Sequence, residues 1–155
     1  MDFIARLIEE HQDYVLQLMK LTEAIEGIRI NGRGEYFRET VDHLWKLLTV
    51  DLDDHAAREE EFLFPRLAQR VPESPVPVML AEHAEIRDRS AVFGQWYPLW
   101  RAGDESAYPQ WSAAARDLRA KFTTHMQKEN LILFPLARRV LPVEELRQLA
   151  ALDER

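Results

Sequence analysis

One motif occurs twice in this chain, and the repeat constrains the fold more than any other feature. The pattern His-x-x-x-Glu-x-x-x-Leu-Phe-Pro begins at His55 and begins again at His125, 70 residues later. A single histidine that follows a glutamate precedes each copy, at His11 and at His83. Histidine and glutamate four positions apart lie on the same face of an α-helix, one turn apart. The repeat therefore predicts a helical unit that occurs twice.

The length and composition are those of one globular domain. The chain has 155 residues, of which 46% are hydrophobic and 30% are charged, and a chain of this length can bury a substantial core. We predict a single domain over 1–155, made of two helical hairpins that span about 3–71 and 75–141.

Composition also excludes several classes of function. The chain has no cysteine, which excludes disulfides, iron–sulfur clusters, thiolate zinc sites and cysteine catalysis. A net charge of −7 argues against nucleic acid as a partner. No signal peptide and no membrane-spanning segment are expected, so we predict a cytoplasmic protein that does not bind membranes.

Helical periodicity runs through the first half of the chain. Apolar residues recur at helical spacing from about residue 4, with Asp2 as the expected N-cap, and the first helix should end in the turn cluster at 31–34. A second helix is expected from about residue 35. Pro65 should end or bend it, because proline disfavours helix at the preceding residue.

The second half of the chain predicts the same arrangement. A short polar connection at 72–75 leads to a third helix, which Gly94 and Pro98 should kink or stop early. A fourth helix should begin between residues 104 and 109, and a short last helix should cover about 142–152. We therefore predict an all-α fold, an antiparallel up-down-up-down four-helix bundle with a short C-terminal helix.

The histidines and glutamates of the motif fall where core residues belong. His55 and Glu59 continue the apolar series of the second helix, and the second copy of the motif does the same in the fourth. At about 1.5 Å rise per residue, each of the four histidines lies about 25–30 Å from the turn of its hairpin. We expect them to meet at one level inside the bundle.

Buried carboxylates need compensation, and metal cations can supply it. An unpaired carboxylate in an apolar core is costly, and no lysine or arginine interrupts the apolar series. The alternative is a metal-free network of His–Glu hydrogen bonds. We favour a metal site whose ligands are His11, His55, Glu59, His83, His125 and Glu129.

The ligand types narrow the choice of metal. Imidazole and carboxylate donors without sulfur suit iron and allow manganese or zinc. If both glutamates bridge two ions, each ion receives two histidine nitrogens and two carboxylate oxygens. A six-coordinate ion then keeps room for solvent and one exchangeable small ligand.

These residues resemble the ligand pattern of the hemerythrin-like, or HHE cation-binding, family. The likeness covers about residues 3 to 140 and rests on all six ligands in register. It implies a four-helix bundle that holds a non-haem di-iron centre, two iron ions with Glu59 and Glu129 as bridges.

Two departures separate the chain from the oxygen-carrying hemerythrins. Those proteins have a second histidine one turn after the third-helix ligand, where this chain has Arg87. They use His-x-x-x-x-Asp in the last helix, where this chain has His-x-x-x-Glu ending at Glu129. The resemblance is closer to the bacterial and regulatory branch, which is linked to iron, oxygen, nitric oxide or peroxide.

Residues around the ligands have assignments of their own. Tyr14 and Arg87 are expected just outside the ligands, with Arg87 paired to an acidic side chain at the mouth of the site. Glu10 and Glu82 point about 100° away from the neighbouring histidines and are expected at the surface. Glu60 is not predicted to be a ligand.

Three functions fit the sequence. The first is a binding or sensing module for iron, oxygen or nitric oxide, and the second is an oxidoreductase that reduces oxygen, peroxide or nitric oxide. The third is a metal-free helical interaction domain. No catalytic residue stands out beyond the ligands, so enzyme activity stays open and metal binding is the predicted activity. A homodimer is compatible with the sequence but is not predicted.

Overall fold

A computed structural model describes residues 1–32 and 35–154 of the chain, and these residues form helices and turns without any strand. The elements are α1 (Phe3–Asn31), α2 (Glu35–His43), η1 (Leu47–Asp51), α3 (Leu52–Arg58), η2 (Glu59–Leu63), α4 (Phe64–Arg70), α5 (Val76–Arg101), η3 (Glu105–Ala107), α6 (Tyr108–Lys128), η4 (Glu129–Leu133), α7 (Phe134–Val140) and α8 (Val143–Asp153).

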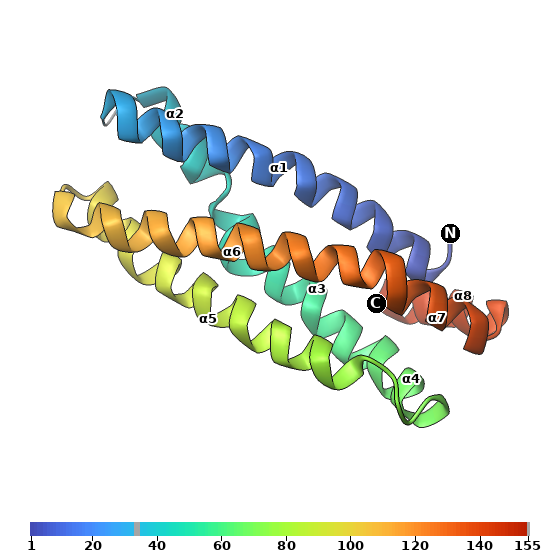
Figure 1. The fold of residues 1–155 in the computed structure, drawn as a ribbon. Helices are drawn as coiled ribbons and strands as arrows, with labels where there is room; N and C mark the ends of the chain where they lie inside the picture. The colour runs from blue at the N-terminus through green and yellow to red at the C-terminus, as the bar shows by residue number, and fades with distance from the viewer. Residues whose placement is uncertain (33–34, 155) are drawn as a thin grey trace.

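The helices form four long antiparallel columns. Figure 1 shows α1 running in one direction, α2 to α4 returning, α5 running out again and α6 with α7 returning. The short helix α8 then folds back against the end of the bundle where α1 begins. This arrangement confirms the predicted all-α, up-down-up-down bundle and the short C-terminal helix.

The ends of α1 follow the expected capping rules. The Asp2 carboxylate accepts a hydrogen bond of 2.8 Å from the backbone N–H of Ala5, which confirms Asp2 as the N-cap. The helix ends before Gly32, whose φ of 74° lies in the left-handed region. The other two residues of the predicted turn cluster, Arg33 and Gly34, lie outside the described residues.

Both repeats of the Leu-Phe-Pro sequence lie in continuous helix. We predicted that Pro65 ends or bends the second helix, and the structure excludes the first outcome, because α4 continues to Arg70. The turn before each proline is a π-helical segment, η2 or η4. There the N–H of Phe64 bonds the Glu59 carbonyl five residues earlier, and the second repeat has the same bond. The wider turn accommodates the proline ring without ending the helix.

The third helix was predicted to kink or to stop early, and the structure excludes the early stop. Pro98 lies inside α5, which continues to Arg101. A proline removes one hydrogen bond from the helix. The side chains of Phe93, Tyr97 and Trp100 are buried on both sides of it, and this packing holds the helix together across the missing bond.

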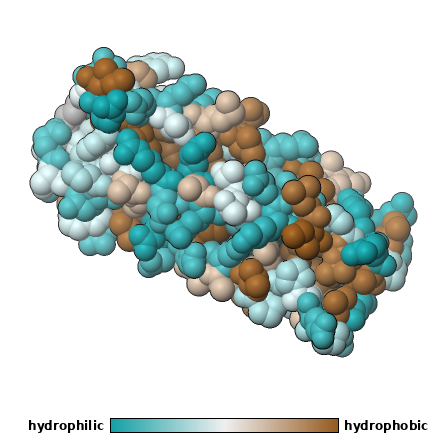
Figure 2. All heavy atoms as spheres, viewed as in Figure 1, coloured by the Kyte–Doolittle hydropathy of each residue, from teal (hydrophilic) through white to brown (hydrophobic). Residues whose placement is uncertain are grey.

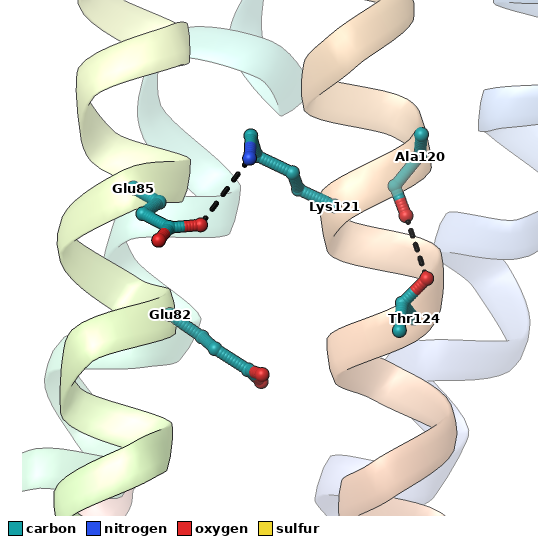
Figure 3. Close-up of a pocket in the computed structure, with 5 residues that line it drawn as sticks. All are labelled: Glu82, Glu85, Ala120, Lys121 and Thr124. Atoms are coloured by element: carbon teal, nitrogen blue, oxygen red, sulfur yellow. Dashed lines mark hydrogen bonds and ion pairs between the residues drawn. The ribbon is translucent and has the colours of Figure 1, made fainter.

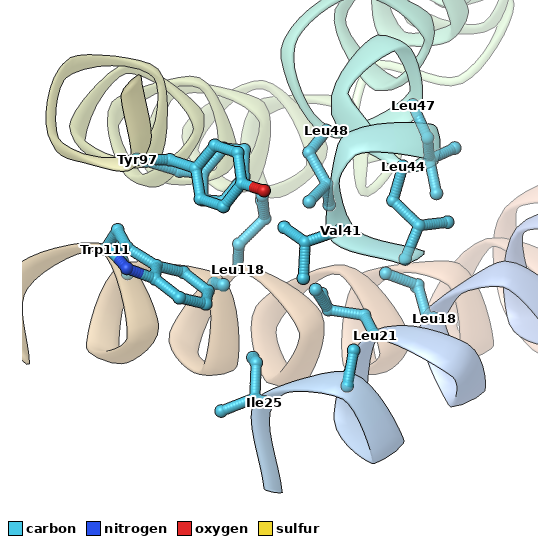
Figure 4. Packing of buried hydrophobic residues seen from close by; sticks show 14 of the residues in the cluster. Leu18, Leu21, Ile25, Val41, Leu44, Leu47, Leu48, Tyr97, Trp111 and Leu118 are labelled. Atoms are coloured by element: carbon cyan, nitrogen blue, oxygen red, sulfur yellow. The ribbon is translucent and has the colours of Figure 1, made fainter. Parts of the chain in front are cut away.

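Two apolar clusters fill the interior, one toward each end of the bundle. The larger cluster joins the α1–α2 and α5–α6 ends, and Figure 4 shows Leu21, Val41 and Leu118 meeting between the columns. The smaller cluster lies around α4, α7 and α8 and includes Phe3 and Leu149. Along every column the histidines and glutamates of the motif stand between the two clusters, so they form a polar layer in an apolar interior.

The surface is mixed in character. Figure 2 shows a largely hydrophilic face, with hydrophobic side chains more frequent toward the end that carries α7 and α8. Among the described residues, no helix combines the length and the apolar character that crossing a membrane requires.

Candidate metal centre

Six side chains from all four columns converge in the polar layer, and each is at most 2% exposed. They are His11 of α1, His55 of α3, Glu59 at the start of η2, His83 of α5, His125 of α6 and Glu129 at the start of η4. Subsets of these residues place donor atoms close enough to hold a metal ion. The structure thus brings together all the residues that the sequence analysis named as ligands.

The imidazoles form two pairs, one within each hairpin. The Nε2 atoms of His11 and His55 are 3.0 Å apart, and those of His83 and His125 are 3.1 Å apart.

Each glutamate reaches both imidazole pairs. Oε1 of Glu59 lies 3.6 Å from Nε2 of His55 and 3.3 Å from Nε2 of His83. Oε1 of Glu129 lies 3.2 Å from Nε2 of His11 and 3.4 Å from Nε2 of His125. A carboxylate that faces one histidine of each pair is placed to bridge two cations.

The outward-facing nitrogen of every imidazole has its own partner. Each Nδ1 atom lies within hydrogen-bonding distance of a side-chain oxygen from another helical segment. The four contacts are His11 to Asn130 at 2.8 Å, His55 to Glu10 at 3.0 Å, His83 to Glu60 at 2.6 Å and His125 to Glu82 at 2.8 Å.

This outer hydrogen bonding fixes the tautomer of each ring. Because a carboxylate or an amide oxygen only accepts, Nδ1 carries the hydrogen, and Nε2 of the neutral imidazole presents a lone pair. Two lone pairs 3.0 Å apart, as between His11 and His55, repel each other unless a cation lies near them. The donor set therefore fits metal ions, and it fits them better than a metal-free hydrogen-bond network.

The two glutamates support the same conclusion. All four carboxylate oxygens of Glu59 and Glu129 are buried and have no hydrogen-bond partner among the described residues. Unpaired buried carboxyl groups are costly. Burial, together with the charge of Glu129, raises the pKa of Glu59 well above its usual value. Burial acts on Glu129 in the same direction, but the neighbouring Glu59, His11 and His125 outweigh it and lower its pKa.

Burial also keeps part of the imidazole set neutral. It lowers the pKa of His55 and His83, and a neighbouring histidine adds to the effect in both cases. For His125 burial acts in the same direction, but the adjacent Glu129 and Glu82 outweigh it and raise the pKa. Neutral imidazole is the form that binds a metal.

The phenylalanine of each motif copy covers a histidine of the opposite hairpin. Phe64 stacks on His83 with ring centroids 5.3 Å apart, and Phe134 stacks on His11 at 5.5 Å. These contacts explain why the motif extends to Leu-Phe-Pro beyond the glutamate: the phenylalanine orients the ligand and shields it from water.

Two sequence assignments around the ligands were wrong. Glu10 and Glu82 were expected at the surface, but their side chains are only 23% and 20% exposed and accept hydrogen bonds from His55 and His125. Helix geometry turns each glutamate away from the histidine that follows it in the sequence. Each side chain then reaches a histidine of the neighbouring column, His55 for Glu10 and His125 for Glu82. Their recurrence before the ligand in both repeats was the signal for this role.

The sequence analysis did not assign the roles of Glu60 and Asn130. Each follows a motif glutamate directly and contacts Nδ1 of a histidine in the opposite hairpin. Only their equivalent place in the two repeats could have indicated this role, because their residue types differ.

Each of the three outer carboxylates is also paired with a cation. Arg58 donates a hydrogen bond of 2.9 Å to Glu10, and Lys128 donates to Glu82. Arg87 lies 2.9 Å from Glu60. It therefore contacts the carboxylate behind His83 and not the histidine itself. Burial opposes ionisation of Glu10, but His55 and Arg58 outweigh it and lower its pKa to about 2.

Tyr14 lies at the edge of the centre. Its hydroxyl donates to Glu10 at 3.2 Å, and its ring centroid lies 5.5 Å from that of His55. Burial and the neighbouring Glu10 raise the pKa of the Tyr14 hydroxyl, which stays protonated at neutral pH.

One outer partner also borders a surface cavity. Figure 3 shows Glu82 extending from α5 toward α6, near the ion pair between Glu85 and Lys121. The cavity has a volume of about 260 Å³ and is lined by Glu82, Glu85, Ala120, Lys121 and Thr124. Glu82 therefore connects His125 in the interior with solvent-accessible space.

Fold and site together define a class, that of antiparallel four-helix bundles with a buried histidine and carboxylate centre that can hold metal. Residues 2–137 match the model of the hemerythrin HHE cation-binding domain. The chain belongs to this family, as the six-residue pattern indicated. Among curated proteins, no significant match to the chain was found.

Proposed function

We propose that the protein is a non-haem di-iron protein. One ion would lie between His11 and His55, the other between His83 and His125, and Glu59 with Glu129 would bridge them. The observation that carries the proposal is the set of four inward lone pairs around two carboxyl groups without hydrogen-bond partners.

The donor set favours iron among the common metals. Imidazole nitrogen and carboxylate oxygen suit iron, whereas the chain offers no thiolate for a sulfur-rich site. Manganese and zinc accept the same donors and would serve as substitutes in binding experiments.

We further propose that the bound iron takes up a small ligand, either oxygen or nitric oxide. When bound, iron supplies reversible ligand binding and redox chemistry. The six residues are at most 2% exposed, and none of them lines the three surface cavities described for this chain. Such burial suits a diatomic molecule or peroxide and excludes a bulky organic substrate.

A double variant tests the metal assignment. The wild-type protein, loaded with iron(II) without oxygen and desalted, should hold two ions per chain by elemental analysis. Glu59→Gln with Glu129→Gln should reduce this content to near zero, because it replaces both bridging carboxylates by neutral amides. The matched control Glu61→Gln changes an exposed glutamate of the same segment and should retain both ions. Unchanged metal content in the double variant would contradict the bridging assignment.

Turnover separates binding from the oxidoreductase alternative. A binding or sensing protein should react once per centre with oxygen, nitric oxide or peroxide. Repeated consumption of peroxide in the presence of a reductant would instead support a di-iron reductase.

A further inference from the structure

The two halves of the centre are similar, and among the four Nδ1 contacts one differs in kind between them. Glu10 with Arg58 in the first hairpin corresponds to Glu82 with Lys128 in the second. The stacked phenylalanines correspond in the same way. The contact of His83 with Glu60, however, corresponds to the contact of His11 with Asn130. A carboxylate in one half is thus replaced by a neutral amide in the other.

The cation paired with that carboxylate changes along with it. Arg87 lies 2.9 Å from Glu60 and is held on its other side by Asp53 at 2.5 Å. The position equivalent to Arg87 in the first half of the repeat is Val15. In the half that has the amide Asn130, Val15 stands in place of the arginine. The carboxylate of Glu60 and the cation of Arg87 are therefore both absent from that half.

A carboxylate behind a histidine changes the strength of that ligand. An imidazole that donates Nδ1–H to a carboxylate is a more basic ligand at Nε2 than one that donates to an amide. Both histidines of the second pair, His83 and His125, have such a carboxylate. In the first pair only His55 has one.

We propose that Glu60 and Asn130 make the two cation positions unequal, so that the ion between His83 and His125 binds first and more tightly. Glu60 and Asn130 act here as positioning residues, through the histidines that they contact. This inference rests on the proposed two-ion function. It assigns the inequality to Glu60 and Asn130, since the carboxylates behind His55 and His125 occur in both halves.

Stepwise binding of a single metal measures the inequality. Metal-free protein titrated with iron(II) in the absence of oxygen should show two calorimetric steps whose affinities differ by at least about tenfold. Glu60→Gln should weaken the tighter step by about 10- to 100-fold, and Asn130→Asp should tighten the weaker step. Glu61→Gln, which changes the exposed neighbour of Glu60, should leave both steps unchanged.

The order of loading gives a second readout that a loss of stability would not produce. One equivalent of ⁵⁷Fe(II) followed by one equivalent of natural iron should give a single Mössbauer doublet in the wild type, and the reverse order should give a different one. In the variant that carries both Glu60→Gln and Asn130→Asp, the two spectra should exchange.

The outcomes distinguish this inference from the function on which it rests. Fewer than two ions per wild-type chain would contradict the proposed function, and the inference with it. Two ions that bind with equal affinity, or binding steps that neither variant changes, would overturn the inference and leave the di-iron function intact.

Discussion

At the scale of single residues, the buried Glu59 carboxyl is costly in the metal-free protein. It is fully buried, and both of its oxygens lack a hydrogen-bond partner among the described residues. A cation between the histidine pairs would offset this cost. The side chains proposed to bind metal should therefore destabilise the protein when metal is absent.

A conservative substitution tests this relation. Glu59→Gln should raise the free energy of unfolding of the metal-free protein at pH 7 by about 1–3 kcal/mol, because burial and the charge of Glu129 oppose ionisation of Glu59 and a neutral amide does not carry that cost. Denaturant unfolding in the presence of a chelator measures the change, and the exposed Glu61→Gln should stay within about 0.5 kcal/mol of wild type. A variant that is less stable than wild type without metal would contradict this account of the site.

Asp42 supplies a pH-dependent contribution far from the centre. It accepts hydrogen bonds from Tyr97 at 2.5 Å and from Arg101 at 2.8 Å. Burial opposes its ionisation, but Arg101 and Tyr97 outweigh it and lower the pKa of Asp42 below the ordinary 3.8. Because the folded pKa is lowered, this stabilisation is present above pH 3.8 and is lost as the pH falls below it.

Asp42→Asn should therefore cost about 1 kcal/mol at pH 7, since the carboxylate is partly exposed and solvent screens its ion pair. The difference from wild type should shrink as the pH approaches 3. Denaturant unfolding at a series of pH values measures it. Asp88→Asn, at an exposed ion pair, should have little effect at any pH, and a pH-independent loss in Asp42→Asn would refute the argument.

The sequence predicted the six residues that meet in the polar layer but not their outer partners, for a geometric reason. His55 and Glu59 continue an apolar series, and a helix projection detects that. The role of Glu10 depends on which column lies beside α1 and on the rotation of that column. A projection of a single helix contains neither quantity, so Glu10 looked like a surface residue.

At the scale of elements, α8 forms part of the core. Its residues Leu146 and Leu149 are each 1% exposed and belong to the apolar cluster around α4 and α7. Its last residue, Asp153, lies 3.2 Å from both Arg6 and Arg58. The helix thus closes the bundle next to the outer carboxylate Glu10, to which Arg58 also donates.

Removing buried volume from α8 should be costly. Leu149→Ala should lower the free energy of unfolding by about 2–5 kcal/mol, because it leaves a cavity in the smaller cluster. Thermal unfolding measures the loss, and Leu152→Ala on the exposed side of the same helix is the matched control. Equal effects of the two substitutions would show that α8 does not close the core.

The π-helical turns are the elements that sequence reasoning could not predict. A proline after two apolar residues usually indicates the end of a helix. Here Phe64 and Phe134 are buried against His83 and His11. Tertiary contact keeps the chain helical through Pro65 and Pro135, and a wider turn accommodates each ring. π-turns of this kind often occur at functional sites.

At the scale of the whole molecule, the polar layer joins the four columns. Each column contributes at least one ligand, so a bound metal would link all of them at the boundary between the two apolar clusters. This architecture could be predicted from the sequence, because both copies of the motif follow a single histidine at almost the same distance. The difference between the two halves could not be predicted from the sequence, because the roles of Glu60 and Asn130 depend on which histidines they contact in the folded chain.

Metal binding should therefore stabilise the entire bundle. A metal that binds only the folded chain, at 100 times its dissociation constant, adds about 2.7 kcal/mol, which corresponds to a rise in melting temperature of about 5–10 °C for this length. Calorimetry with and without iron(II) measures the rise. The variant with Glu59→Gln and Glu129→Gln should show none, and a rise of equal size in that variant would place the stabilising metal elsewhere.

Anomalous diffraction at the iron edge, from crystals loaded with iron(II), tests the central claim most directly. We expect two peaks, one beside Nε2 of His11 and His55 and one beside Nε2 of His83 and His125, with Glu59 and Glu129 between them. No peak in the polar layer, or imidazoles and carboxylates turned away from the iron positions, would contradict it.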